Sequence, residues 1–128
     1  LARYNSNGSL DTGFGNNGIV MMPLGSTQAP RAAQVFDLAI QTSDGKIIAG
    51  GFSSGVVTSR DFTFVRYNAD GTVDTSFGVD GIEISPFSAQ IDEIHALDLL
   101  SDGTILAGGF TSNDNGENTD FHLATYTP

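Results

Sequence analysis

The sequence predicts an all-β protein made of four-stranded antiparallel blades of the β-propeller type. Residues 1–20 (LARYNSNGSLDTGFGNNGIV) and 64–83 (FVRYNADGTVDTSFGVDGIE) share ten of twenty residues at an offset of 63. Residues 39–53 match residues 97–111 at an offset of 58, with eight identities in fifteen. The chain has 16 glycines but only five lysines and arginines, and no stretch shows the 3.6-residue period of an amphipathic helix. Repeats of this length with many turn residues indicate propeller blades.

The first repeat predicts strands joined by tight turns. Residues 23–34 contain two prolines and no strand periodicity, so we expect a surface connection there. The remaining strands follow from apolar runs bounded by turn residues. They are expected at residues 1–4, 19–22, 35–40 and 46–52, with turns at 5–8 and 42–45 and loops at 12–18 and 53–60.

The second repeat replays this pattern. Residues 62–67 carry aromatic side chains on both faces, which predicts a strand covered on both sides. Further strands are expected at residues 94–100, 104–110 and 121–126, with turns at 68–71 and 101–103. Ala49, Gly50 and Gly51 indicate that a neighbouring backbone approaches closely, because larger side chains would hold it away.

The repeats define the expected domain organisation. Residues 1–128 form one propeller segment, with repeat 1 at about 1–63, repeat 2 at about 64–122 and the start of a third strand motif at 123–128. Two blades cannot close a ring, which usually needs about four to eight. We therefore expect further blades as partners, supplied by a longer parent chain or by other copies of this one.

The charge and composition of the chain exclude several classes of partner and binding site. The net charge of −10 and the sequence pI of about 4.1 argue against binding to nucleic acid or to an anionic membrane surface, both of which need basic groups. The chain contains no cysteine, so disulfides and thiolate metal sites are excluded. No apolar run is long enough to cross a membrane, so no membrane insertion is expected.

The repeated turns suggest two interpretations. Residues 5–11 and 68–74 place oxygen-bearing side chains and a glycine as calcium loops do. However, Arg3 and Arg66 stand where the first carboxylate should be, and Arg66 is better placed to pair with Asp70 or Asp74 across the turn. We therefore favour a hairpin with an arginine–aspartate clamp and assign no metal ligand. The oxygen-rich residues 113–120 are similarly interpreted as a solvated loop.

The best candidate binding residues are Asp37 and His95. At an offset of 58 they align with each other near the start of the inner strand, so we expect them at equivalent heights near the channel mouth of a ring. No serine, histidine and acid set and no phosphate loop occurs in the sequence, so no catalytic residue and no cofactor is predicted.

The motifs also support a family resemblance. Arg-Tyr-Asn at residues 3–5, Gly-Ser-Leu-Asp at 8–11, Phe-Gly at 14–15, Ser-Asp-Gly-Lys at 43–46 and Ala-Gly-Gly at 49–51 resemble the roughly sixty-residue repeats grouped as DUF5122, or delta-60, β-propeller repeats. The resemblance implies a propeller in large, often secreted or surface-associated bacterial proteins and implies no activity. The last copy departs from the pattern, with His122 and with residues 125–128 (Thr-Tyr-Thr-Pro) where Arg-Tyr-Asn would stand.

Three functions are compatible with this pattern. The leading hypothesis is a noncatalytic structural or interaction module of a larger extracellular or cell-surface bacterial protein, because residues repeated in every blade build a scaffold. The alternative is a lectin-like, carbohydrate-binding propeller with a similar pocket at each blade, so that a glycan or a protein is a further possible partner. A lyase or hydrolase working in the central channel is supported by fold analogy alone.

Overall fold

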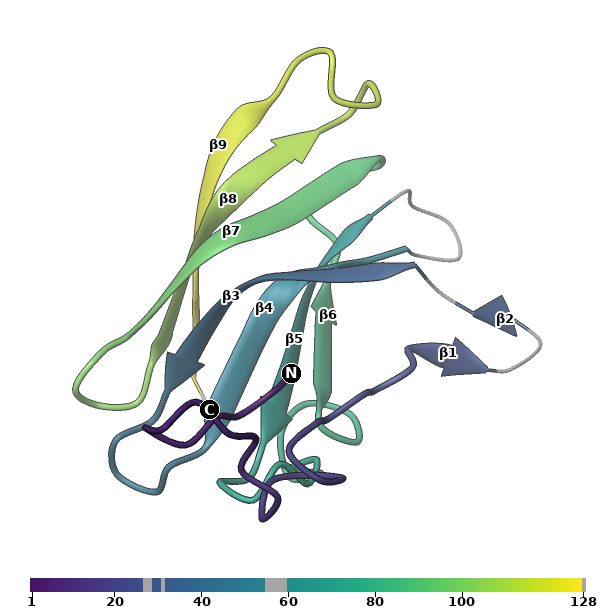
Figure 1. The fold of residues 1–128 in the computed structure, drawn as a ribbon. Coiled ribbons are helices and arrows are strands. Elements are labelled where there is room, and N and C mark those ends of the chain that lie inside the picture. The colour runs from purple at the N-terminus through teal and green to yellow at the C-terminus, as the bar shows by residue number, and fades with distance from the viewer. Residues whose placement is uncertain (27–28, 31, 55–59, 128) are drawn as a thin grey trace.

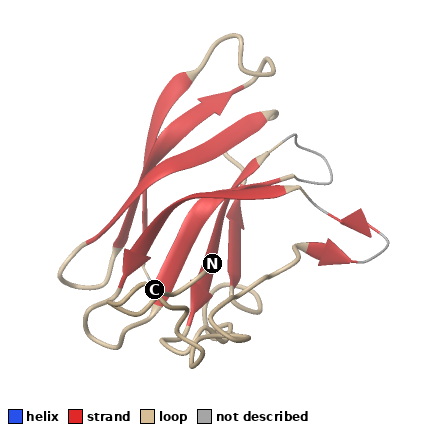
Figure 2. Ribbon diagram, in the orientation of Figure 1, coloured by secondary structure: helices blue, strands red, loops and turns tan. Residues whose placement is uncertain are grey.

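The computed structural model describes residues 1–26, 29–30, 32–54 and 60–127. All regular structure in these ranges is β-strand (Figure 2), which confirms the all-β prediction. Within the same ranges no helix is long and apolar enough to cross a membrane. The strands are β1 (Gly25–Ser26), β2 (Ala29–Pro30), β3 (Ala33–Ile40), β4 (Ile47–Ser53), β5 (Asp61–Tyr67), β6 (Ile82–Ser85), β7 (Ile91–Leu99), β8 (Ile105–Ser112) and β9 (Asp120–Tyr126).

Two antiparallel sheets form the body of the molecule (Figure 1). The first sheet has the strand order β3-β4-β5-β6, and the second has the order β7-β8-β9. Each strand pairs with its neighbour in sequence, as expected for blades joined by hairpins. The first sheet has four strands, the number predicted for a blade, but it takes β3 and β4 from repeat 1 and β6 from repeat 2. The second sheet has three strands in the part of the chain that the structure describes.

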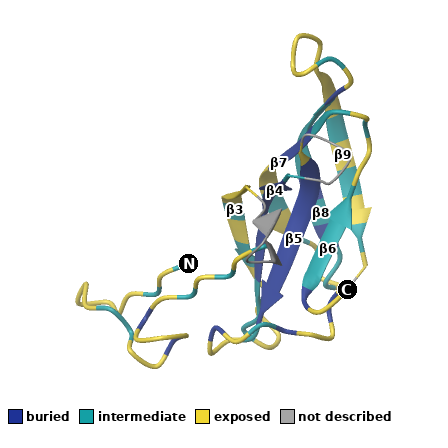
Figure 3. Ribbon diagram, turned by 90° about the vertical axis from the view of Figure 1, so that its right-hand side faces the viewer, coloured by how far each residue is buried: buried dark blue, intermediate teal, exposed yellow. Residues whose placement is uncertain are grey.

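The inner strands β4 and β5 of the first sheet are covered on both faces, and β5 is buried along its whole length (Figure 3). One face carries Phe62 and Phe64, both 0% exposed, which pack with Ile94 and Ile105 of the second sheet. On the opposite face, Val65 and Tyr67 pack against apolar side chains from the first 24 residues. The prediction of a strand covered on both sides is therefore confirmed.

The N-terminal residues depart from the prediction. Residues 1–4 and 19–22 do not form strands; they are joined only by isolated bridges, such as Ala2 with Ile19. Residues 64–67 extend into a full strand because β4 pairs along one side of β5 and β6 pairs along the other. Residues 1–4 have no counterpart of β4 beside them in the described chain, so their pairing stays local.

Two other connections also differ from the prediction. Residues 23–34 were expected to contain no strand, but β1 and β2 form a two-residue antiparallel pair there. The pair is only two residues long, and β3 also begins inside this range, at Ala33. Residues 27–28 and 31 lie outside the described residues. In the loop expected at residues 53–60, Ser53 still belongs to β4, and residues 55–59 lie outside the described part.

Candidate functional site

The inner strands β3 and β7 each contain a bulge. The register of β3 against β4 shifts between Val35 and Asp37, which leaves Phe36 as the extra residue. The register of β7 against β8 shifts between Ile94 and Ala96, which leaves His95 as the extra residue. Bulges redirect a side chain and strengthen the local twist, so these positions are set apart from the rest of each strand.

Glycines make these bulges possible. A Cβ atom on Gly51 would overlap the carbonyl oxygen of Gln34, and one on Gly109 would overlap the carbonyl oxygen of Glu93. The close backbone approach that the sequence predicted for Ala-Gly-Gly is therefore confirmed at its second glycine. The neighbouring backbone is the bulged inner strand of the same sheet.

The bulges correct the alignment of Asp37 with His95. The strand pairing makes Phe36 the counterpart of His95, and Asp37 the counterpart of Ala96. The reason is the turn that follows each inner strand, which spans residues 41–46 in the first sheet but only residues 100–104 in the second. Because the turn of the second sheet is one residue shorter, equivalent residues are 59 apart in the inner strands and 58 apart after the turns.

Asp37 connects the two sheets. Its carboxylate accepts hydrogen bonds from the backbone N–H of Leu38 (2.8 Å) and, across the sheet boundary, from the backbone N–H of Leu97 (2.7 Å). Both carboxylate oxygens of the half-buried side chain are therefore engaged by backbone donors. The assignment of Asp37 to ligand binding stays a prediction.

His95 lies in a group of aromatic and charged side chains. Its ring stacks on Phe36, with centroids 4.7 Å apart and an interplanar angle of 14°. Its Nε2 is 3.3 Å from Oε2 of Glu93, whose other carboxylate oxygen pairs with Arg60. The Arg60 guanidinium in turn lies 4.6 Å from the centroid of the Phe52 ring. The histidine side chain remains 50% exposed at the end of this chain of contacts.

The structure thus brings His95 together with residues that the sequence did not single out. The 58-residue offset aligned His95 with Asp37 and not with Phe36, so Phe36 was not recognised. Arg60 is far from Glu93 in sequence. Glu93 is only 4% exposed and the adjacent Asp92 is fully buried, and neither burial is visible in the sequence. A signal was available at one position, because Glu93 and His95 are two residues apart in a strand and such residues share a face.

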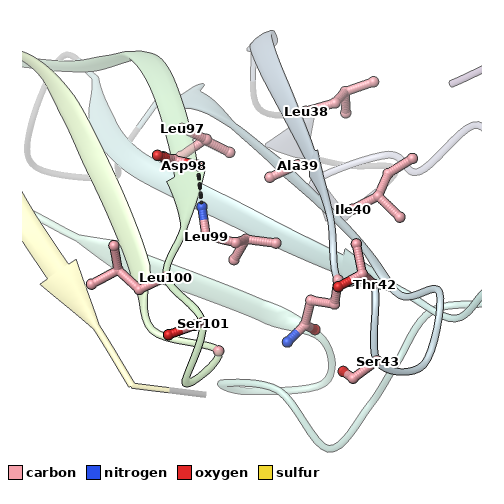
Figure 4. Close-up of a pocket in the computed structure, with 12 residues that line it drawn as sticks. Leu38, Ala39, Ile40, Thr42, Ser43, Leu97, Asp98, Leu99, Leu100 and Ser101 are labelled. Carbon is pink, nitrogen blue, oxygen red and sulfur yellow. Dashed lines mark hydrogen bonds between the residues drawn. The ribbon is translucent and has the colours of Figure 1, made fainter.

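A groove of about 370 Å³ lies between the inner strands (Figure 4). Leu97 and Leu99 of β7 point toward β3, and Ala39 points back toward them, whereas Leu38 and Ile40 point away. Turn residues from both sheets close its end, including Thr42, Ser43 and Ser101. The Asp37–Leu97 hydrogen bond fixes the spacing of the two walls at one end of this groove.

One polar atom of the groove has no partner. The side-chain oxygen Oε1 of Gln41 is buried and accepts no hydrogen bond from any residue that the structure describes. A buried acceptor without a donor is unfavourable unless water or a ligand supplies one. The groove therefore combines an aliphatic wall with a hydrogen-bond acceptor and hydroxyl groups, and its lining contains no cationic side chain.

The repeated turns carry the arginine–aspartate clamp that the sequence favoured. The Arg66 Nε donates to Asp74 at 2.7 Å, and its guanidinium lies 4.7 Å from the centroid of Phe77. The equivalent Arg3 donates to Asp11 at 2.8 Å and stacks over Phe14. Of the two partners considered for Arg66, the structure selects Asp74. In the described residues, no group of three or more histidine, cysteine, aspartate or glutamate side chains could hold a metal ion.

The Asp74 carboxylate contacts several hydrogen-bond donors. The Ser76 hydroxyl donates to it at 2.6 Å, and the Lys46 ammonium lies 2.9 Å from it. These two contacts, followed by Arg66, hold the pKa of Asp74 far below its ordinary value. Asp74 is thus an ionised carboxylate surrounded by donors, two of them cationic.

The second oxygen-rich loop is satisfied internally. Asp114 accepts hydrogen bonds from the Asn118 backbone N–H at 2.8 Å and from the Ser112 hydroxyl at 2.7 Å. Hydrogen bonds from Asn118, then from Ser112, lower the pKa of Asp114. The loop at residues 113–120 therefore organises itself around this one carboxylate.

Comparison with known proteins agrees with the architecture. The family model described as "Domain of unknown function (DUF5122) beta-propeller" matches residues 1–14, 42–77 and 100–128, more than half of the chain. No curated protein and no solved structure matches the chain. The chain belongs to the DUF5122 β-propeller family, a family whose function is unknown.

Proposed function

We propose that the chain is a noncatalytic structural or interaction module of a larger secreted or surface bacterial protein, in which its sheets pack against further blades. The proposal rests on one comparison between equivalent positions of the two sheets. Phe62 of β5 and Phe121 of β9 hold the same register, opposite Phe52 and Phe110 respectively. Phe62 is 0% exposed, whereas Phe121 is 88% exposed.

The next inward-facing position repeats this difference. Phe64 lies opposite Gly50 and is 0% exposed, whereas its counterpart Leu123 lies opposite Gly108 and is 62% exposed. Burial of a large apolar side chain stabilises by about 1.5–3 kcal/mol, and contiguous exposed apolar residues mark interaction surfaces. The face and edge of β9 therefore have the character of a blade surface that lacks its neighbour.

Sedimentation velocity over a hundredfold concentration range tests this proposal. The wild-type chain should sediment faster as its concentration rises, and the double variant Phe121→Ser, Leu123→Ser should lose this dependence. Val79→Asn is the matched control, because Val79 is 76% exposed and the first repeat has an asparagine at the equivalent position. Concentration-independent sedimentation of wild type and variants alike would contradict the proposal.

Carbohydrate binding is a second candidate, supported by the groove between β3 and β7. Sugars combine C–H faces with hydroxyl donors, and the groove offers the leucine wall, the serine and threonine hydroxyls and the unpartnered Gln41 oxygen. Titration with neutral mono- and disaccharides, followed by backbone amide NMR shifts at residues 97–101, tests this candidate. Gln41→Met should abolish the shifts and Gln34→Met should not, whereas unchanged spectra at millimolar sugar would exclude the site.

A further inference from the structure

The motif that repeats most clearly also forms a joint between the repeats. In the second repeat, residues 68–72 form a tight turn, here called the second turn. Its Asp70 carbonyl accepts a hydrogen bond from the backbone N–H of Gly15 (2.7 Å), and its Ala69 carbonyl accepts one from the guanidinium of Arg3. The turn of one repeat is therefore held by the loop of the repeat before it.

The fit at this joint is close. Gly71 of the second turn is buried and has a φ of 88°, a conformation that favours glycine. A Cβ atom there would lie 2.9 Å from the nitrogen of Gly15, from the ring of Phe14 and from a methyl group of Val20. These residues with Arg3 are called the first socket, and the second turn occupies it.

The second repeat contains the same socket. Phe77 donates to the Asp74 carbonyl at 3.1 Å, as Phe14 donates to Asp11 at 3.0 Å. Gly81 donates to the Phe77 carbonyl at 2.9 Å, again as in the first repeat. The second socket consists of the residues at the offset of 63, namely Arg66, Phe77, Gly78 and Glu83.

The second socket is open. The backbone N–H of Gly78, the counterpart of Gly15, has no hydrogen bond within the described residues, and Gly78 is exposed. A cavity of about 390 Å³ lies beside it and is lined by residues 76–78, Glu83 and residues 125–127. The position that receives a turn in the first repeat is therefore preformed and vacant in the second.

The first repeat supplies the complementary observation. Its turn at residues 5–9 has the same internal hydrogen bonds as the second turn, with Gly8 donating to the Asn5 carbonyl at 2.9 Å. Gly8 has a φ of 84°, but no atom of the described residues lies within 4 Å of a Cβ built on it. Tyr4 beside it is 62% exposed, whereas its counterpart Tyr67 is 5% exposed. This turn therefore has the conformation of the second turn, but in the described residues no socket surrounds it.

We propose that the second socket is a docking site for the Asp-Gly turn of another repeat of the same kind. The occupant is argued from the filled joint, where such a turn supplies a carbonyl acceptor to the loop glycine and a glycine that fits against the phenylalanine. The proposal rests on the proposed packing with further blades and names the contact that fixes each blade to the next. The sockets differ at Val20 and Glu83, whose carboxylate accepts a hydrogen bond from the Ser85 hydroxyl at 3.3 Å.

The strand register shows where such a turn would enter. Tyr67 and Tyr126 are equivalent, because they lie opposite Ile47 and Ile105 at the same ends of β4 and β8. A turn that follows Tyr126 as the second turn follows Tyr67 would reach the second socket. The test therefore lengthens the full chain after Pro128 by a copy of residues 70–85, which supplies both the turn and the equivalent of β6.

Amide hydrogen exchange is the decisive measurement. In the lengthened chain the Gly78 amide should exchange about tenfold more slowly than in the original, with the Gly15 amide as an internal reference for a filled socket. A second lengthened chain carries Gly71→Val in the added copy only, so that strand pairing is retained but the turn no longer fits. It should leave the Gly78 amide exchanging at the original rate.

The outcomes separate the two proposals. Protection of Gly78 by the glycine copy alone supports the docking site. Unchanged exchange of Gly78, with both copies raising the midpoint of thermal unfolding, overturns the docking site but keeps the packing of further blades. If neither copy raises that midpoint nor protects Gly78, both proposals fail.

Discussion

The carboxylate of Asp37 on β3 accepts a hydrogen bond from the backbone N–H of Leu97 on β7, at 2.7 Å. This bond crosses from one sheet to the other, and both residues adjoin the groove between the inner strands. A single side chain therefore holds together two walls that belong to different repeats.

Replacement of this carboxylate should destabilise the molecule. Asp37→Ala leaves the Leu97 N–H without its acceptor, and because this bond is only partly buried the loss should lie near the lower end of the range of about 1–3 kcal/mol. The control is Asp98→Ala, because Asp98 is exposed and, among the described residues, accepts a hydrogen bond only from the adjacent Leu99 N–H. Urea unfolding measures both, and equal midpoints for the two variants would show that the bond between sheets contributes nothing.

The two clamps should differ in strength because they differ in burial. The Arg66 side chain is 8% exposed, whereas that of Arg3 is 39% exposed. Arg66→Met should lower the free energy of unfolding by about 3 kcal/mol, since it breaks a buried pair. Arg3→Met should lower it by no more than about 1 kcal/mol, because exposed ion pairs contribute little. Denaturant unfolding of both variants checks this order, and a larger loss for Arg3→Met would contradict it.

The lowered pKa of Asp74 makes stability depend on acid. Because the folded-state pKa lies below the unfolded value, ionised Asp74 stabilises the fold above about pH 4, and this contribution is lost as the pH falls further. The free energy of unfolding should therefore fall less steeply below pH 4 in Asp74→Asn than in the wild type. Part of the slope remains, because the pKa values of Asp70, Asp102 and Asp114 are also lowered. Identical slopes in urea unfolding between pH 5 and pH 2 would refute this assignment.

The glycines beside the bulges provide a matched comparison in one strand. Gly109→Ala places a methyl group on the Glu93 carbonyl and should lower the free energy of unfolding by about 3 kcal/mol. Gly108→Ala should change it by no more than about 0.5 kcal/mol, because the nearest atom to its Cβ is a Leu123 methyl group at 3.8 Å. Circular dichroism during thermal unfolding distinguishes the two, and equal midpoints would show that the bulge backbone yields easily.

The sequence predicts the architecture because the turns and the arginine–aspartate clamps form between residues close in sequence and occur in both repeats. Turns such as those at Gly8 and Gly71 need a left-handed glycine, and the arginine–aspartate clamp spans only eight residues. Residues with such strict requirements recur in both repeats, so a comparison of the chain with itself locates strands, turns and clamps.

The sequence predicts the candidate site only in part, because the site depends on strand register and on contacts between residues far apart in sequence. A turn shorter by one residue shifts the inner strand, so Asp37 and His95 do not occupy equivalent positions. The pairing of Arg60 with Glu93 joins residues 33 apart and follows from sheet packing rather than from spacing. The joint between Asp70 and Gly15 is a further contact of this kind.

Strands pair on both sides of β5 in the first sheet, whereas its counterpart β9 pairs only with β8 among the described residues. Amide hydrogen exchange on the intact chain, at a concentration where it sediments as single molecules, tests this difference. The amides of β5 should all be protected, whereas about half of the β9 amides should exchange rapidly. Uniform protection of β9 equal to that of β5 would contradict this account, because it would mean that the β9 edge is already covered.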